Sequence, residues 1–208
     1  SVGGFFRNYE NFFGNTTFTP TADFFALYGI DPDTYGAFTV ATQYNITSIV
    51  RSSGYSIDYK QVLSFLPPWA RGVQVFANMS AQRVTADPAA RNSFDGFSPR
   101  NANWGISLTR LRYSLRLNWS FHALQRFGIV TGTGIAPNTF QWAPPRTVFD
   151  IHGEGRIGQS LVLFANIRNV NNSSDAREIY NPSTPEVARL RVRQSIGALV
   201  TVGVKGSF

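Results

Sequence analysis

The sequence contains no cysteine, one methionine and little charge, since only 15% of its residues are charged. The lack of cysteine suits a chain that crosses an oxidising compartment, although many cytosolic proteins share it. No apolar run approaches the roughly 20 residues that a transmembrane helix needs, so no such helix is expected. With 43% apolar residues, the composition fits neither a disordered chain nor a helical membrane protein. The chain length suits a single domain that is neither disordered nor a helical membrane protein.

A concentrated basic surface is also missing, although the net charge is +7. Binding to nucleic acid needs basic residues clustered on one face, with aromatic side chains that stack on bases. The arginines are dispersed instead, and their short clusters fall where strands are expected to end: Arg110, Arg112, Arg189, Arg191 and Arg193. We therefore expect no nucleic-acid partner. The chain also opens without a charged and then apolar leader, so we expect a mature protein or a fragment.

The sequence does contain apolar residues at every second position, most clearly over residues 194–208. Successive side chains of a strand point to opposite faces, so this period predicts one apolar and one polar side. In a soluble protein the apolar side would meet a core, and in an outer-membrane barrel it would meet lipid. Leu199 is the exception to the alternation. The apolar residues that share one side are Ile196, Ala198, Val200, Val202, Val204 and Phe208.

The same period predicts about eight strands along the chain. Their approximate ranges are 2–14, 37–65, 72–85, 100–110, 113–128, 146–157, 160–171 and 194–208. Long and short connections alternate between them: the long ones centre on 20–36, 86–99, 131–145 and 172–193, and the short ones are 66–71, 111–112 and 158–159. This sorting is typical of an up-and-down outer-membrane barrel, with short periplasmic turns and long extracellular loops. We therefore predict an all-β fold, an antiparallel transmembrane β-barrel segment.

The faces of the central strands agree with this fold. One predicted face of residues 113–122 holds Tyr113, Leu115, Leu117, Trp119 and Phe121, and the other holds Ser114, Arg116, Asn118, Ser120 and His122. An arginine facing lipid at the midplane would cost about 2 to 4 kcal/mol, so Arg116 must face the lumen. The strand from residue 72 repeats the pattern, with Phe76 on its polar side. Aromatic residues near a short turn resemble an interfacial girdle: Tyr55, Tyr59, Phe65 and Trp69.

Two regions depart from simple alternation. Residues 37–65 are too long for one crossing of about 9 to 11 residues, so we expect a strand that extends beyond the membrane, bulged near 45–48. Residues 21–28 predict a short helix in the first long connection, because Thr21 suits the N-cap and Gly29 suits the stop.

Two segments near the C-terminus resemble the TonB-dependent outer-membrane receptors. Residues 160–171, which are SLVLFANIRNVN, resemble the penultimate barrel strand of that family, and residues 197–208, GALVTVGVKGSF, resemble its last strand. Residues 50–60, VRSSGYSIDYK, are similar to an earlier strand. The resemblance implies a barrel of about 22 strands filled by a plug, whereas this chain supplies about eight. Residues 1–208 are therefore expected to be the C-terminal part of such a barrel.

The resemblance also implies a function and partners. The complete protein would take up a large nutrient, such as a metal chelate or a glycan, across the cell outer membrane. The implied partners are outer-membrane lipid, the missing plug and remaining barrel strands, and TonB through that absent plug. The barrel assembly machinery would recognise the final strand through Phe208, Val204, Val202 and Val200. No cofactor is implied.

Ionisable residues on the predicted lumen side form a possible polar cluster. Its members are Arg116, His122, Asp150, His152, Glu154 and Arg156. A metal site needs three or four converging ligands, and we expect hydrogen-bonded pairs instead, because charges in such a lumen must be paired. Ser120 and His122 lie two residues apart on one strand, but no third group is spaced to orient the histidine as a base. We therefore predict no catalytic role and no metal site.

Two alternatives remain. The first is an autonomous eight-stranded outer-membrane barrel of structural or adhesin type, which an even strand number permits. The second is a soluble β-sandwich that acts as a binding module or a hydrolase. Dependence on detergent would separate the second alternative from the membrane proteins.

Overall fold

The computed structural model describes residues 1–87, 90–91 and 95–206, with the backbone alone at residues 15–17. The chain divides into two compact units. The first unit comprises Ser1–Phe6, Ser53–Arg83 and Asp95–Phe208, and the second comprises Arg7–Ser52 and Val84–Phe94.

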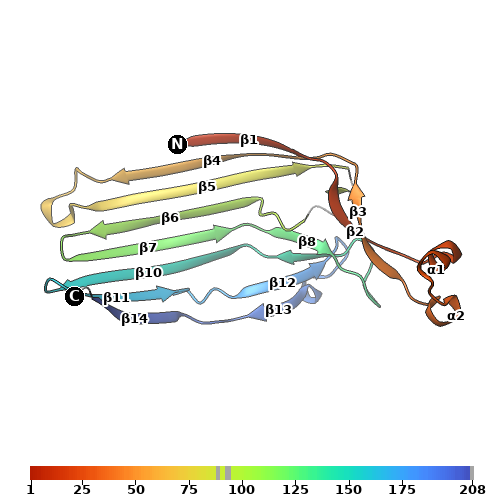
Figure 1. The fold of residues 1–208 in the computed structure, drawn as a ribbon. Coiled ribbons are helices and arrows are strands. Elements are labelled where there is room, and N and C mark those ends of the chain that lie inside the picture. The colour runs from red at the N-terminus through yellow and green to blue at the C-terminus, as the bar shows by residue number, and fades with distance from the viewer. Residues whose placement is uncertain (88–89, 92–94, 207–208) are drawn as a thin grey trace. The chain divides into compact units, whose positions relative to one another are not determined.

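An antiparallel sheet of eight strands forms most of the first unit (Figure 1). In spatial order its strands are β1 (Val2–Tyr9), β4 (Val50–Val62), β5 (Val73–Thr85), β6 (Arg100–Thr109), β7 (Tyr113–His122), β10 (Arg146–Ile157), β11 (Leu161–Arg168) and β14 (Leu199–Gly206). Every neighbouring pair from β5 to β14 is antiparallel. Successive long strands are therefore neighbours in space, as the sequence predicts.

Short turns connect these strands at one end of the sheet, on the left in Figure 1. They are the segment around the 3-10 helix η1 (Pro68–Ala70), residues 110–112 between β6 and β7, and residues 158–160 between β10 and β11. Gly158 makes the last of these turns with a φ of 64°, a conformation that favours glycine. The predicted sorting of short connections to one end is confirmed.

At the opposite end the chain forms a second antiparallel sheet. Its strands, in spatial order, are β13 (Leu190–Gln194), β12 (Asp175–Tyr180), β9 (Phe140–Ala143) and β8 (Gln125–Ile129), and the 3-10 helix η2 (Glu186–Ala188) precedes β13. Part of each predicted loop is thus strand: residues 140–143 of the range 131–145, and residues 175–180 and 190–193 of the range 172–193. These strands are short, and besides pairing with one another they are joined by ring contacts such as that of Trp142 with Tyr180, whose centroids lie 5.0 Å apart.

The second unit contains a hairpin and two short helices. The hairpin is β2 (Phe12–Phe18) paired with β3 (Val40–Ile46), and between them lie α1 (Ala22–Tyr28) and α2 (Pro32–Tyr35). The Oγ1 of Thr21 accepts a hydrogen bond from the backbone N–H of Phe24 at 3.4 Å, and Gly29 ends α1 in the left-handed conformation. The predicted helix and both of its ends are confirmed. The larger buried apolar side chains of this unit are Phe25, Ile46, Val50 and Val84.

Several predicted strands are interrupted where the backbone turns. The range 2–14 breaks at Asn11 (φ 51°), and the range 160–171 ends before Asn169 (φ 56°). Gly197 (φ 78°) separates β13 from β14, so Ile196 and Ala198 lie outside the last strand. A positive φ is incompatible with a strand ladder, and the hydrophobic period carries no information about it. The range 37–65 divides between β3 and β4 near the expected bulge, and 86–99 is described only in part.

The eight-stranded sheet is open. Strands β1 and β14 are its edges, and no described strand pairs with the outer side of either one. The all-β antiparallel fold with short and long connections is therefore confirmed, but this chain alone does not form a closed barrel.

Candidate functional site: the two faces of the main sheet

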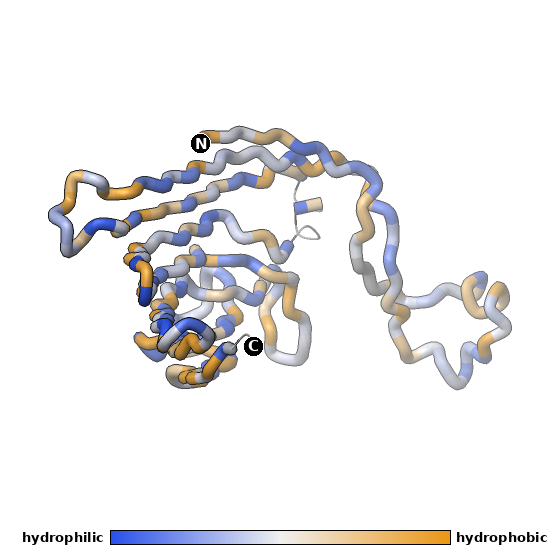
Figure 2. The backbone as a smooth tube through the Cα atoms, turned by 60° about the vertical axis from the view of Figure 1, so that its left-hand side comes forward, coloured by the Kyte–Doolittle hydropathy of each residue, from blue (hydrophilic) through white to orange (hydrophobic). Residues whose placement is uncertain are grey.

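The strand register aligns the apolar residues of six strands on one face. Residues directly opposite each other in an antiparallel pair share a face, so the pairings from β5 to β14 can be followed across the sheet. One transverse row contains only branched apolar residues: Val75, Ile106, Leu117, Ile151, Ile167 and Val200. We call this side of the sheet, with the residues in phase with that row, the apolar face. Figure 2 shows hydrophilic and hydrophobic stretches alternating along the strands.

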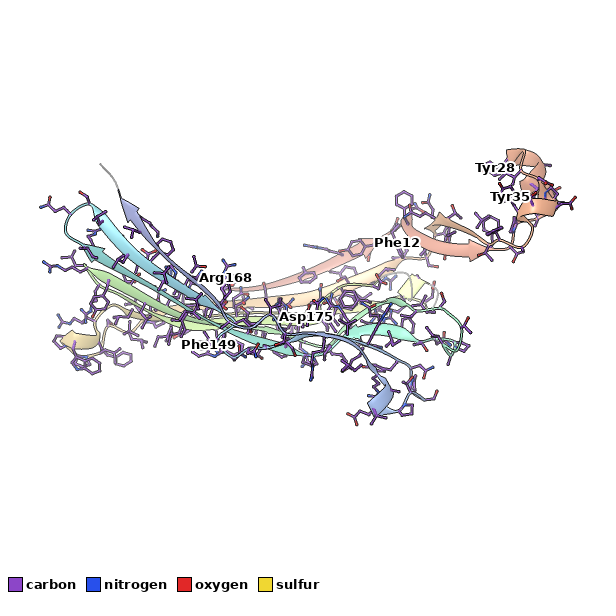
Figure 3. All side chains as sticks on the ribbon, turned by 90° about the horizontal axis from the view of Figure 1, so that it is seen from below. Phe12, Tyr28, Tyr35, Phe149, Arg168 and Asp175 are labelled. Carbon is purple, nitrogen blue, oxygen red and sulfur yellow. The ribbon has the colours of Figure 1, made fainter. Side chains whose placement is uncertain are left out.

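Large side chains of the apolar face are exposed. Relative exposure is 41% for Leu115, 43% for Leu163 and 70% for Val202. Trp119 and Phe149 are direct cross-strand partners on this face, and their rings stack with centroids 4.5 Å apart. Figure 3 shows side chains projecting from both sides of the sheet. Soluble monomers rarely expose a contiguous apolar surface that spans six strands.

The first unit has almost no hydrophobic core of its own. Among its described residues, the buried apolar ones are Ala70, Ala123 and Ala176. In the described part of this unit, no apolar side chain larger than alanine is buried. Burial of apolar surface is the dominant favourable term in folding, so this sheet needs something to cover its apolar face.

The opposite side, which we call the polar face, carries a matching row of polar residues. This row consists of Gln74, Ser107, Arg116, His152, Asn166 and Thr201. Arg116 therefore lies on the polar side, as predicted, while Leu115 and Leu117 lie on the apolar side.

Phenylalanines on the polar face lie over glycines of neighbouring strands. Phe76 is the direct partner of Gly105, and Phe164 is the direct partner of Gly203. A Cβ atom added at Gly105 would lie 2.5 Å from the Phe76 ring, and one at Gly203 would lie 2.6 Å from the Phe164 ring. Cations contact the same rings: the guanidinium of Arg116 is 4.6 Å from the Phe76 centroid. The position of Phe76 on the polar side, which departs from the alternation, is thus explained by its packing over Gly105.

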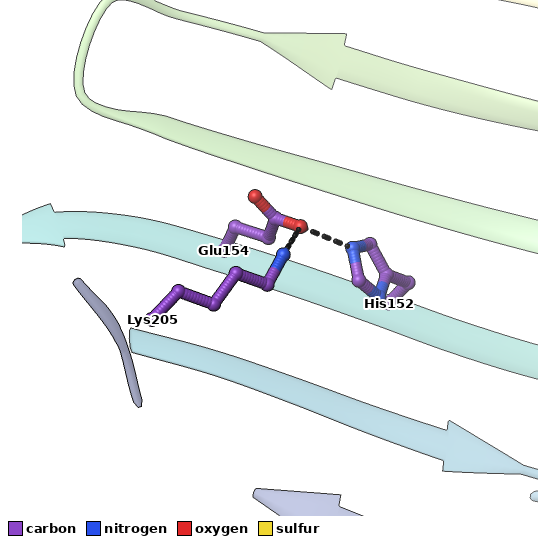
Figure 4. A network of polar contacts seen from close by, with 3 residues as sticks. All are labelled: His152, Glu154 and Lys205. Carbon is purple, nitrogen blue, oxygen red and sulfur yellow. Dashed lines mark hydrogen bonds and ion pairs between the residues drawn. The ribbon is translucent and has the colours of Figure 1, made fainter. Parts of the chain in front are cut away.

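Three residues of the polar face form a charged network (Figure 4). The Nζ of Lys205 donates to Oε1 of Glu154 at 2.8 Å, and Nε2 of His152 lies 3.1 Å from the same oxygen. His152 and Glu154 belong to the predicted polar cluster. Lys205 was missed, because β10 and β14 lie on either side of β11 and only the register brings them together.

The other predicted cluster members make separate contacts. Nδ1 of His122 lies 2.8 Å from Oδ1 of Asn101, and His122 pairs in register with Arg146 at the strand end, away from His152. Asp150 accepts a hydrogen bond from the backbone N–H of Asn169 at 2.8 Å. Arg156 lines a small pocket with Arg110 and Arg112 near the short turns. The six residues thus share the polar face but do not converge on one centre. Among the described residues no group of three or more His, Asp or Glu side chains could hold a metal ion.

Asn169 joins the two connections that run between the sheets of the first unit, and it was not singled out from the sequence. Its side-chain amide donates to the backbone carbonyls of Ser173 and Gly197 at 3.2 and 3.1 Å, and its Oδ1 accepts from the N–H of Ser173. The asparagine-rich end of the segment 160–171 is the signal that could have found it, because asparagine tolerates a positive φ and bonds nearby backbone.

The predicted assembly and girdle residues are exposed. Val200, Val202 and Val204 lie on the apolar face of β14, with exposures of 59%, 70% and 61%, whereas Phe208 lies outside the described residues. The predicted girdle aromatics, all exposed, occur in β4 and around η1: Tyr55, Tyr59, Phe65 and Trp69.

Among the described residues, no helix combines the length and the apolar character needed to cross a membrane. Comparison of the chain with protein-family models, with curated proteins and with solved structures finds no match.

Proposed function

We propose that this chain is a wall and extracellular-loop segment of a TonB-dependent receptor in the cell outer membrane. The observation that carries the proposal is the continuous, exposed apolar face of the main sheet, in a unit whose described residues bury no apolar side chain larger than alanine. Lipid would cover that face as a core covers the apolar face of a soluble sheet. The polar face would then line the lumen.

The charges agree with this assignment. On β7, β10, β11 and β14 the charged side chains fall on the polar face, including Arg116, Glu154 and Lys205, whereas Arg100 at the end of β6 is opposite Ala81 and in phase with the apolar face. A cation at the bilayer midplane on the apolar side would cost about 2 to 4 kcal/mol. The sorted connections support the orientation, with the short turns on the periplasmic side and the second sheet extending outside the cell.

The open edges favour a segment of a larger barrel. Unpaired backbone groups cost several kcal/mol each in lipid, so strands at β1 and β14 need partners there. In the proposed receptor these partners are the remaining barrel strands, and a plug fills the lumen. An autonomous eight-stranded barrel would instead pair β1 with β14, which are separate edges in the structure. A soluble β-sandwich would need a second apolar sheet packed on the first.

The proposal assigns the segment no chemistry of its own. The complete receptor would take up a large nutrient, such as a metal chelate or a glycan, with energy delivered through TonB and the plug. We also propose that the barrel assembly machinery recognises Val200, Val202 and Val204 of β14 together with Phe208.

Cell fractionation and crosslinking test the proposal. The protein that carries this chain should sediment with the outer membrane, resist extraction by alkaline carbonate and dissolve in detergent. It should also form crosslinks to TonB in living cells. Recovery from the soluble fraction without detergent would favour the β-sandwich, and outer-membrane location without any TonB crosslink would favour the autonomous barrel.

A further inference from the structure

A cavity of about 470 Å³ lies on the polar face of the main sheet. Five strands contribute to its wall, from β4 to β7 together with β10. The donors among its lining residues are Lys60, Gln74, Ser107, Thr109, Ser114, Arg116 and His152.

The register places most of these donors side by side. Gln74 is opposite Ser107, Ser107 is opposite Arg116, and Arg116 is opposite His152. Directly opposite residues have Cβ atoms about 5 Å apart. A single small group above this row can therefore reach side chains from several strands at once.

The cavity has positive charge and no acidic wall. Among the described residues that line it, Lys60 and Arg116 are cations and none is Asp or Glu. The neighbouring carboxylates already have partners: Glu154 accepts from Lys205 and contacts His152, and Asp58 accepts from the side-chain amide of Asn78. Among the described residues, neither Lys60 nor Arg116 forms an ion pair with a carboxylate.

The position of Arg116 suits the binding of an oxyanion. Its guanidinium lies 4.6 Å from the centroid of the Phe76 ring, which also lines the cavity. Contact with a ring restrains the guanidinium, while its N–H groups stay available for two parallel hydrogen bonds to an oxyanion. The hydroxyl groups of Ser107 and Ser114 add neutral donors.

We propose that this cavity is an oxyanion site, which binds a phosphate or carboxylate group through Arg116 and Lys60 with help from the neighbouring hydroxyl donors. The inference concerns the polar face alone, so it goes beyond the membrane assignment and does not depend on it. The anion has two possible sources, a free ion and a carboxylate elsewhere in the same protein.

Thermal unfolding with inorganic phosphate as the probe tests the site. The complete protein carrying this chain is unfolded in increasing phosphate, with chloride adjusted to keep ionic strength constant. The variants are Arg116→Gln and Lys60→Gln. Arg168→Gln is the matched control, because it removes the same charge from the polar face outside the cavity. If Arg116→Gln does not fold, Lys60→Gln supplies the same comparison.

For a free anion, phosphate should raise the unfolding midpoint of the wild type and the control with a saturable dependence. The apparent affinity should fall about tenfold in Arg116→Gln, as expected when one charge-assisted contact is lost. For a carboxylate in the same protein, phosphate should have no effect, and Arg116→Gln should lower the midpoint where the control does not. The proposal would be overturned if Arg116→Gln and Arg168→Gln had the same apparent affinity for phosphate and the same unfolding midpoint. A protein that proves soluble would contradict the receptor proposal and would still allow this titration.

Discussion

The ring of Phe164 lies over Gly203, its direct partner across the β11–β14 pair. A Cβ atom at position 203 would lie 2.6 Å from the ring, so a side chain there would have to displace it. The ammonium group of Lys205 lies 5.1 Å from the centroid of the same ring. The glycine thus lets a large aromatic lie flat on the polar face, where a cation contacts it.

This packing predicts that Gly203→Ala destabilises the protein. Displacing the ring should cost about 1 to 3 kcal/mol, as is typical for overpacking. Urea unfolding of the complete protein in micelles measures the change. Gly155→Ala is the matched control, because a Cβ there meets nothing within 4 Å. The cost of Gly203→Ala should also shrink in a Phe164→Ala background. Equal effects of the alanines at 203 and 155 would mean that the ring contact is unimportant.

The start of α2 predicts a dependence on pH. The Thr34 hydroxyl and the backbone N–H of Asp33 donate to the carboxylate of Asp31, at 2.5 and 3.0 Å, and these bonds lower its pKa from 3.8. Because the folded pKa lies below the unfolded value, the stabilisation is complete above pH 3.8 and is lost as the pH falls through the folded pKa. Backbone NMR shifts of residues 32–35 should therefore lose their helical values at acid pH. Asp31→Asn keeps a capping side chain and should remove this transition; an unchanged acid transition in that variant would contradict the assignment.

Local patterns in the sequence predict much of this fold. Alternation placed Leu115 and Arg116 on opposite faces, because the strand period is a property of the backbone itself. Thr21 and Gly29 marked both ends of α1, because capping involves only neighbouring residues. The order of the long strands followed from the lengths of their connections.

Relationships between distant residues were not predictable in this way. The contact of Lys205 with Glu154 joins residues 51 positions apart, and it depends on the register of two successive strand pairs. The cavity around Arg116 and Lys60 depends in the same way on pairings across the sheet. Strands β12 and β13 were missed because they are only six and five residues long, too short for a period of two to stand out. The positive φ angles of Asn11 and Asn169 broke strands that the hydrophobic pattern continued.

The open edges predict that the 208-residue chain, expressed alone, does not form a single stable species. Each edge is a row of unpaired backbone groups, and such rows pair with other chains. Refolded in detergent, the chain should aggregate or give a mixture of oligomers in size-exclusion chromatography. A monodisperse, heat-resistant monomer with a strand-rich circular dichroism spectrum would instead identify an autonomous eight-stranded barrel.

Cysteine labelling tests most directly the central claim that one face of the sheet meets lipid. The chain has no cysteine, so single cysteines introduced into it have no background within the chain. Three positions of β7 lie on the apolar face, Leu115, Leu117 and Trp119, and three lie on the polar face, Ser114, Asn118 and Ser120.

In outer membranes that contain the complete protein, each cysteine is treated with a water-soluble thiol reagent after the lumen has been made accessible. The cysteines at 115, 117 and 119 should be shielded by lipid, whereas those at 114, 118 and 120 should react. Each reacting position is matched to a shielded neighbour on the same strand, so depth in the membrane does not explain the difference. Equal labelling of the two sets would contradict the lipid-facing surface and with it the proposed place of this chain in the outer membrane.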